Sequence, residues 1–231
     1  MFKQKVMVPM TIPYLLTFLL LTFLCMEAHE TFHHLVGGVL CGGFGTMTLT
    51  VYEPTCDQYI VTFAGPFLSF AIAWIGGYLL LKNTHVLFAY TLIFASFAHL
   101  RFPLPIAKMG DEWSVLRNYL PLSSRYWVAG ILFLLALPPL VIAFRSIANK
   151  RRIQIFTAMW LLPLSLLYLL PFVDTWLFGP DLDRQSLSLI GVPLVILVVD
   201  LVAIGLYMFS QNKVFGQLRL SEIKNEQILL S

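Results

Sequence analysis

The stretch Glu27-Ala28-His29-Glu30-Thr31-Phe32-His33-His34 ends the first long apolar run of the chain. Residues four apart share one face of a helix, so His29 and His33 can bind one metal ion with Glu30 beside them. A coincidental pair of hydrogen-bonded histidines at a helix end is the alternative. Ionisable side chains at membrane depth are costly and are by default functional candidates. We therefore take this stretch as a candidate metal site.

The composition indicates a membrane protein. Of the 231 residues, 58% are hydrophobic and only 12% are charged, about half the charged fraction of soluble domains. The formal charge of +3 comes from basic residues scattered among loops, and nucleic-acid binding would need them clustered on one face. We expect one polytopic bundle that lies in the lipid bilayer and binds no nucleic acid.

Six runs are long enough to cross a bilayer, which takes about 20 residues of helix. They are Val8–Leu35, Tyr59–Leu81, His85–Leu100, Tyr126–Phe144, Ile153–Val173 and Leu187–Phe209. The third is short and is expected to extend at either end. Pro138-Pro139, Pro163 and Pro193 predict kinks, which neighbouring helices can tolerate. The predicted fold class is an all-α polytopic membrane protein with about six transmembrane helices.

The basic residues also predict an orientation, because cytoplasmic loops are enriched in lysine and arginine. With the N-terminus in the cytoplasm, that side receives Lys3, Lys5, Lys82, Arg145, Lys150, Arg151, Arg152, Lys213, Arg219 and Lys224. Only the segment Arg101–Arg125, with four basic residues, argues against this arrangement. Both termini are therefore expected in the cytoplasm, most simply at the cytoplasmic membrane of a prokaryote.

Two further patterns lie near the candidate site. Thr46–Val51 alternates threonine with apolar residues, which predicts a short β-strand or hairpin between the first two helices. The second helix carries Gly65, Ser69, Ala73 and Gly77, a stripe of small residues that allows close approach to a neighbour. We expect this stripe to hold the second helix against the one that bears His29.

A catalytic zinc ion usually has three protein ligands and an open fourth position. Asp111 is the best candidate for the third ligand, since the predicted topology brings it to the same membrane level as the histidines. Glu53 and Asp57 are weaker candidates and Asp174 is possible. Asp200 and Asp174 are more simply read as structural carboxylates, because neither belongs to a motif.

The other polar residues of these helices have more ordinary interpretations. Glu27 or His34 could orient an imidazole, although solvated capping explains them equally well. His85 and His99 are read as hydrogen-bonded residues rather than ligands. Cys25 is read as a packing residue, and Cys41 and Cys56 would pair only if their loop faces an oxidising compartment, so free thiols are favoured.

The sequence resembles the site-2 protease family of intramembrane zinc metalloproteases. Its first motif is matched by His29-Glu30-Thr31-Phe32-His33, followed by Gly37-Gly38 and Gly42-Gly43. Its Gly-Pro element looks like Ala64-Gly65-Pro66, and its third motif looks like Pro103-Leu104-Pro105 through Gly110-Asp111. The match covers roughly the first half of the chain, and Glu112 stands where the family often has glycine.

The resemblance implies a catalytic core over residues 1–125, three additional transmembrane helices over 126–209 and a cytoplasmic tail over 210–231. It implies that His29, His33 and Asp111 bind Zn²⁺ and that Glu30 is the catalytic base. The expected activity is hydrolysis of peptide bonds in or near transmembrane segments, with single-span membrane proteins as substrates. The alternative is a zinc-binding membrane protein or transporter without proteolytic activity.

Overall fold

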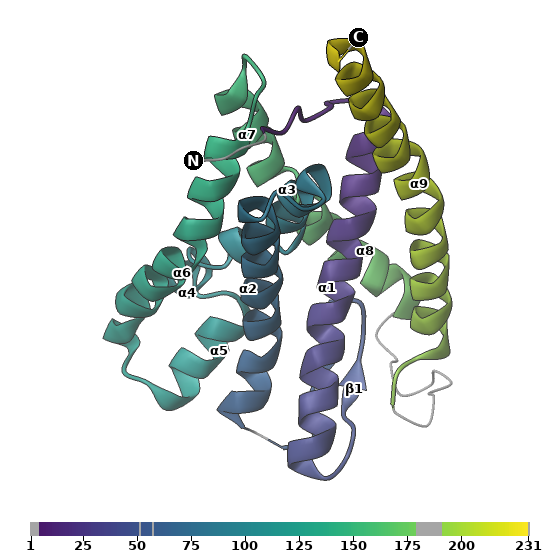
Figure 1. Ribbon diagram of the computed structural model, residues 1–231. Coiled ribbons are helices and arrows are strands. Elements are labelled where there is room, and N and C mark those ends of the chain that lie inside the picture. Colours follow the sequence, from purple (N-terminus) through teal and green to yellow (C-terminus); the bar gives the residue numbers. More distant parts are fainter. Residues whose placement is uncertain (1–4, 51, 57, 179–190, 231) are drawn as a thin grey trace.

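The computed structural model describes residues 5–50, 52–56, 58–178 and 191–230, and almost all of this chain is helical (Figure 1). The helices are α1 (Ile12–Cys41), α2 (Tyr59–Leu81), α3 (Val86–Ala95), α4 (Leu104–Ala107), α5 (Gly110–Tyr119), α6 (Arg125–Ser146), α7 (Arg152–Leu161), α8 (Leu164–Phe178) and α9 (Leu194–Leu230). Single 3-10 turns occur at η1 (Ala98–Leu100) and η2 (Leu122–Ser124), and the strands are β1 (Thr46–Met47) and β2 (Tyr52–Glu53).

The predicted fold class is confirmed. Six helical segments within the described residues are long and apolar enough to cross a membrane. They are Ile12–Cys41, Tyr59–Leu81, Val86–Ala107, Leu122–Ser146, Arg152–Leu177 and Leu194–Gln211. Each overlaps one of the six predicted runs, so the chain is a multi-pass, all-α membrane protein.

The third and fifth segments are broken rather than continuous. α3 ends at Ala95, and Phe97 takes a left-handed conformation with φ of 45° before η1 and α4 follow. In the fifth segment, α7 ends at Leu161 and α8 begins at Leu164, so the helix is interrupted at Pro163, where a kink was predicted. The cause is that proline cannot donate a helical hydrogen bond. The prolines of α6 leave that helix unbroken, and Pro193 precedes α9 rather than kinking it. The first part of the predicted sixth run, 187–190, lies outside the described residues.

α1 lies at the centre of the molecule, with α2 and α9 packed along it on either side (Figure 1). The small-residue stripe of α2 accounts for part of this packing, because Gly65 and Ser69 face α1. Gly77 instead faces Pro139 of α6. The prediction that the whole stripe faces α1 is therefore wrong at its last member, because a spacing of four drifts around a helix of 3.6 residues per turn.

The segment between α1 and α2 contains the expected hairpin, with β1 and β2 antiparallel and Met47 opposite Tyr52. The predicted hairpin is confirmed, and within Thr46–Val51 the strand covers Thr46 and Met47, whereas residues 48–50 bend at the tip of the hairpin. Val51 lies outside the described residues. The threonine hydroxyls that suggested a strand instead bind a carboxylate from α8.

A disulfide joins Cys41 to Cys56 at the base of this hairpin. The sequence favoured free thiols, so that expectation is wrong. α1 ends at Cys41, and the chain reverses at Gly42 and returns so that the two cysteine Cα atoms are 5.6 Å apart. Cys25 is free and buried, as expected for a packing residue.

The N-terminal segment lies against the connection between α6 and α7 at the opposite end of the bundle (Figure 1). The Val6 amide donates to the Ser146 carbonyl at 2.8 Å, and the Ala148 amide donates to the Val6 carbonyl at 2.9 Å. Lys5 and the basic residues around Lys150 therefore lie at one end of the molecule. The hairpin and its disulfide lie at the other.

Candidate metal centre

α1 places His29 and His33 one helical turn apart on the same face. Both side chains are buried, and their Nε2 atoms are 3.2 Å apart. The rings meet edge to face, with centroids 4.8 Å apart. The predicted pair of imidazole groups therefore converges on one point inside the bundle.

α2 orients the two rings. The His33 Nδ1–H donates to the Val61 carbonyl at 2.6 Å, and His29 Nδ1 is hydrogen-bonded to the Ser69 hydroxyl at 2.9 Å. Because each Nδ1 atom is engaged by α2, each Nε2 atom is directed toward the other ring. Partners of this kind fix the ring orientation of metal-binding histidines.

Gly65 makes this close approach possible. A Cβ atom at this position would collide with Nε2 of both His29 and His33. Any side chain other than hydrogen would therefore displace the imidazole rings. The Gly-Pro element at Ala64-Gly65-Pro66 thus has a steric role at the site, in addition to close helix packing.

Asp111 reaches the same point from the start of α5. Its Oδ2 atom is 3.2 Å from His29 Nε2 and 3.5 Å from His33 Nε2. Burial opposes ionisation, but the polar contacts with His29 and His33 and the Arg101 charge hold the pKa of the Asp111 carboxyl well below its usual range. The carboxylate is therefore ionised at neutral pH, as a metal ligand must be.

Arg101 and Glu112 complete the cluster, and the sequence interpretation missed both. Arg101 is only 4% exposed, donates to Asp111 and Glu112, and has Nη1 3.4 Å from His29 Nε2. Glu112 is fully buried. Arg101 directly follows the third apolar run, and a charge at that depth needs a partner; that signal could have identified the pair. Counting Arg101 as a loop charge in the orientation argument was wrong.

Glu30 follows His29 on α1 and is half-buried. Asp111, His33 and Arg101 all exert an electrostatic influence on its carboxylate. Among the described residues, no hydrogen bond or ion pair engages that carboxylate. Glu30 is therefore a carboxylate beside the converging ligand atoms that remains available to a substrate or a water molecule.

The remaining candidate residues lie apart from this cluster. The His34 ring packs on Phe44 and Tyr52, and His99 is hydrogen-bonded to the Trp160 carbonyl. Asp174 binds the hairpin tip, and Glu53 pairs with Thr46 in the hairpin. Asp57 lies outside the described residues. The carboxylate oxygens of Glu27 have no hydrogen-bond partner among the described residues, and neither does Oδ1 of Asp200.

Three side chains, His29, His33 and Asp111, have ligand atoms within 4.8 Å of one another. Within the described residues, this is the one group of three or more histidine, cysteine, aspartate or glutamate side chains that could hold a metal ion. The charge of the cluster also fits a cation. Carboxyl groups outnumber guanidinium groups in the cluster, with Glu30, Asp111 and Glu112 around Arg101. Excess negative charge is costly away from water, and a divalent cation would compensate it.

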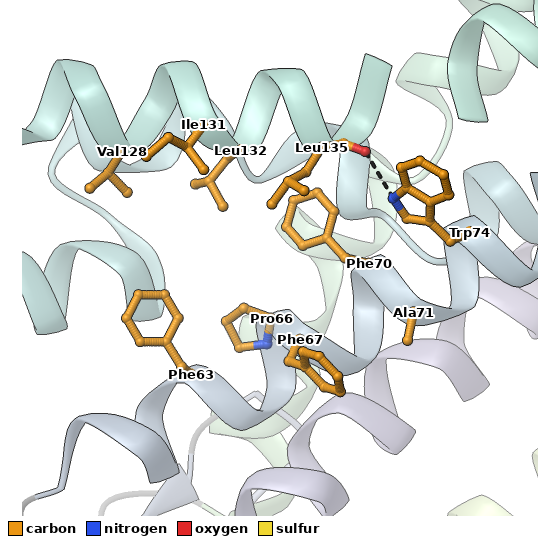
Figure 2. A pocket seen from close by; sticks show the side chains of 10 residues that line it. All are labelled: Phe63, Pro66, Phe67, Phe70, Ala71, Trp74, Val128, Ile131, Leu132 and Leu135. Carbon is orange, nitrogen blue, oxygen red and sulfur yellow. Dashed lines mark hydrogen bonds between the residues drawn. The ribbon is translucent and has the colours of Figure 1, made fainter. Parts of the chain in front are cut away.

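An apolar cavity of about 680 Å³ lies between α2 and α6 (Figure 2). Its lining includes Phe63, Phe67, Phe70 and Trp74 of α2, and the Trp74 indole N–H donates to the Leu135 carbonyl at 3.1 Å. These aromatic residues are on the side of α2 away from Gly65 and Ser69. The cavity is therefore separated from the metal-ligand cluster by α2 itself.

No family model, curated protein or solved structure matches the chain.

Proposed function

We propose that the chain is an intramembrane zinc metalloprotease that hydrolyses peptide bonds in or near the transmembrane segments of other membrane proteins. One observation carries the proposal: two imidazole nitrogens, from a helix long and apolar enough to cross a membrane, converge with the Asp111 carboxylate near Glu30. Two histidines and a carboxylate are a ligand set typical of catalytic zinc. The resemblance of the first motif to the site-2 protease family supports the same conclusion.

Each residue of the cluster has a distinct task in this proposal. His29, His33 and Asp111 hold the ion, and Arg101 holds Asp111 in place. Zinc in such a site polarises a peptide carbonyl and makes a water molecule acidic enough to lose a proton near neutral pH. Glu30 accepts that proton and delivers it to the leaving amine. The free carboxylate of Glu30 supports this assignment, because a general base needs an unoccupied acceptor.

The proposed substrates are single-span membrane proteins. A peptide bond within a helix is shielded by its own turn, so the substrate must be unwound locally, with its backbone groups bound by the protein. The hairpin next to the site can accept such an extended segment at a strand edge. Residues 46–47 and 52–53 form the paired strands of the hairpin, and the tip at 48–50 is engaged by Asp174.

We place the protein in a cytoplasmic membrane with both termini in the cytoplasm. Lys5 and the basic residues around Lys150 lie at the same end of the bundle, as the positive-inside rule requires. The Cys41–Cys56 disulfide lies at the other end, and disulfides persist in oxidising compartments. The metal cluster is then nearer to the outer side of the membrane.

The decisive comparison is between wild type and Glu30→Gln, purified in detergent, repleted with zinc and incubated with single-span membrane proteins. We expect one zinc ion per chain in both proteins and cleavage by the wild type alone. Loss of the general base should lower kcat by at least about 100-fold. Zinc in both proteins with equal rates of cleavage would contradict the role of Glu30. Zinc in both with no cleavage of any substrate would favour a zinc-binding protein or transporter.

A further inference from the structure

The carboxylate of Asp174, near the end of α8, binds three groups at the hairpin tip. Oδ2 accepts hydrogen bonds from the Thr48 hydroxyl at 2.8 Å and the Thr50 hydroxyl at 2.7 Å. Oδ1 accepts one from the Leu49 backbone amide at 3.0 Å. Hydrogen bonds to a charged acceptor are about twice as strong as neutral ones. A single side chain from the second half of the chain therefore fixes three consecutive residues of the hairpin.

The hairpin has little stability of its own. Among the described residues of the hairpin, two residue pairs form its ladder, Thr46 with Glu53 and Met47 with Tyr52. An isolated two-stranded hairpin is marginally stable at best. The disulfide fixes its base, and Asp174 fixes its tip. Buried Met47 of β1 and Leu49 of the tip pack against side chains of α8 and α9, with Phe23 of α1 in the same cluster. The polar anchor of the tip, Asp174, thus lies outside the first three transmembrane helices.

The same hairpin lies against the metal-ligand cluster. The Tyr52 ring stacks on His33, with centroids 6.1 Å apart and an interplanar angle of 13°. A Cβ atom at Gly37, one turn after His33, would collide with the Tyr52 hydroxyl, so the hairpin sits directly on α1. A displacement of the tip therefore changes the position of Tyr52 relative to a candidate metal ligand.

We propose that Asp174 is a positioning residue that holds the hairpin against the metal-ligand cluster, so that an extended substrate segment bound there is presented to Glu30. The substrate part of this inference rests on the proposed function, whereas the anchoring of the hairpin does not. No motif of the sequence includes Asp174. Its role arises from the contact between α8 and the hairpin.

The test compares Asp174→Ala with Thr175→Ala in the full-length protein. Thr175 is the matched control, because within the part of the chain that the structure describes its hydroxyl donates to the Pro171 carbonyl of its own helix alone. Zinc content, hydrogen exchange of residues 44–55, and KM and kcat for cleavage are measured in each. In Asp174→Ala we expect the hydrogen-exchange rate of residues 44–55 and the KM for cleavage each to rise about tenfold. This is the scale of a lost hydrogen bond to a charged group. Zinc content and kcat should stay within about twofold of wild type, as a positioning role requires.

A second variant, Thr48→Val with Thr50→Val, removes two donors and leaves Asp174 in place. It should raise exchange and KM in the same direction. In the Asp174→Ala background it should add little further, because residues that share one interaction are not additive. Full additivity of the two changes would overturn the assignment of these donors to Asp174.

The readouts separate this inference from the proposed function. Unchanged exchange in Asp174→Ala with normal cleavage would overturn the anchoring role and leave the protease assignment standing. Loss of zinc together with a fall in kcat would also overturn it, because Asp174 would then support the whole fold. A wild type that binds zinc but cleaves nothing would refute the protease, and faster exchange in Asp174→Ala would still uphold the anchor.

Discussion

At the scale of single residues, the histidine pair comes from α1 but its geometry comes from α2. A helix brings His29 and His33 to one face, which the sequence predicts directly. The partners that aim both Nε2 atoms inward, Val61 and Ser69, are on another helix. The hydrogen bond to a backbone carbonyl could not be predicted from sequence, because a carbonyl group carries no residue identity. Gly65, by contrast, was part of the motif that the sequence displays.

Gly65→Ala should lower zinc affinity at least tenfold, because the added Cβ displaces both imidazole rings and disturbed ligand orientation has effects of that size. The matched control is Gly77→Ala on the same helix. There the nearest atom to the added Cβ is Pro139 Cα at 3.6 Å, which is ordinary contact. Zinc titration of both purified variants checks the prediction. Equal zinc affinity in the two variants would show that Gly65 is only a packing residue.

At the scale of elements, the interrupted third span is what completes the site. The sequence predicts an apolar run that ends at Leu100 and places Asp111 at the correct membrane level. It does not predict that Arg101 and Glu112 form a buried ion pair, because partners eleven residues apart meet only if the chain turns between them. The short helix α4 and the left-handed residues Lys108 and Gly110 provide that turn.

Arg101→Met should destabilise the protein by about 3–5 kcal/mol, because it leaves the buried Glu112 carboxylate without its partner. The double variant Arg101→Met with Glu112→Leu removes both charges and should recover most of that stability. Thermal unfolding of the zinc-free proteins measures the free energies. In both variants, zinc affinity should remain at least tenfold below that of wild type, because Asp111 has lost its partner Arg101. Recovery of zinc affinity in the double variant would contradict the positioning role of Arg101.

At the scale of the whole molecule, the predicted six-span architecture was confirmed because it depends only on the length and polarity of each run. The details that proved wrong, the free thiols and the last residue of the small-residue stripe, both depend on contacts between distant segments. Asp174 illustrates this limit, because no local sequence pattern predicts its three hydrogen bonds to the hairpin. The division of function at residue 125 stays a prediction.

Orientation in the membrane can be tested with single reactive cysteines in a Cys25→Ala background. Lys150 and Asn118 are both exposed, on the α6–α7 connection and on α5 respectively. We expect Lys150→Cys to react with a membrane-impermeant maleimide only in inverted vesicles, and Asn118→Cys only in intact cells. The reverse pattern would place both termini outside, and reaction of both cysteines on one side would contradict the six-span topology.

X-ray absorption at the zinc edge tests the central claim, that His29, His33 and Asp111 hold the metal, most directly. The zinc-repleted wild type should show two imidazole ligands and oxygen ligands, with all bonds at about 2.0–2.2 Å. His33→Ala should lose one imidazole contribution or the zinc itself, whereas His34→Phe should leave the spectrum unchanged. Sulfur ligands, or a wild-type spectrum without imidazole, would contradict the account.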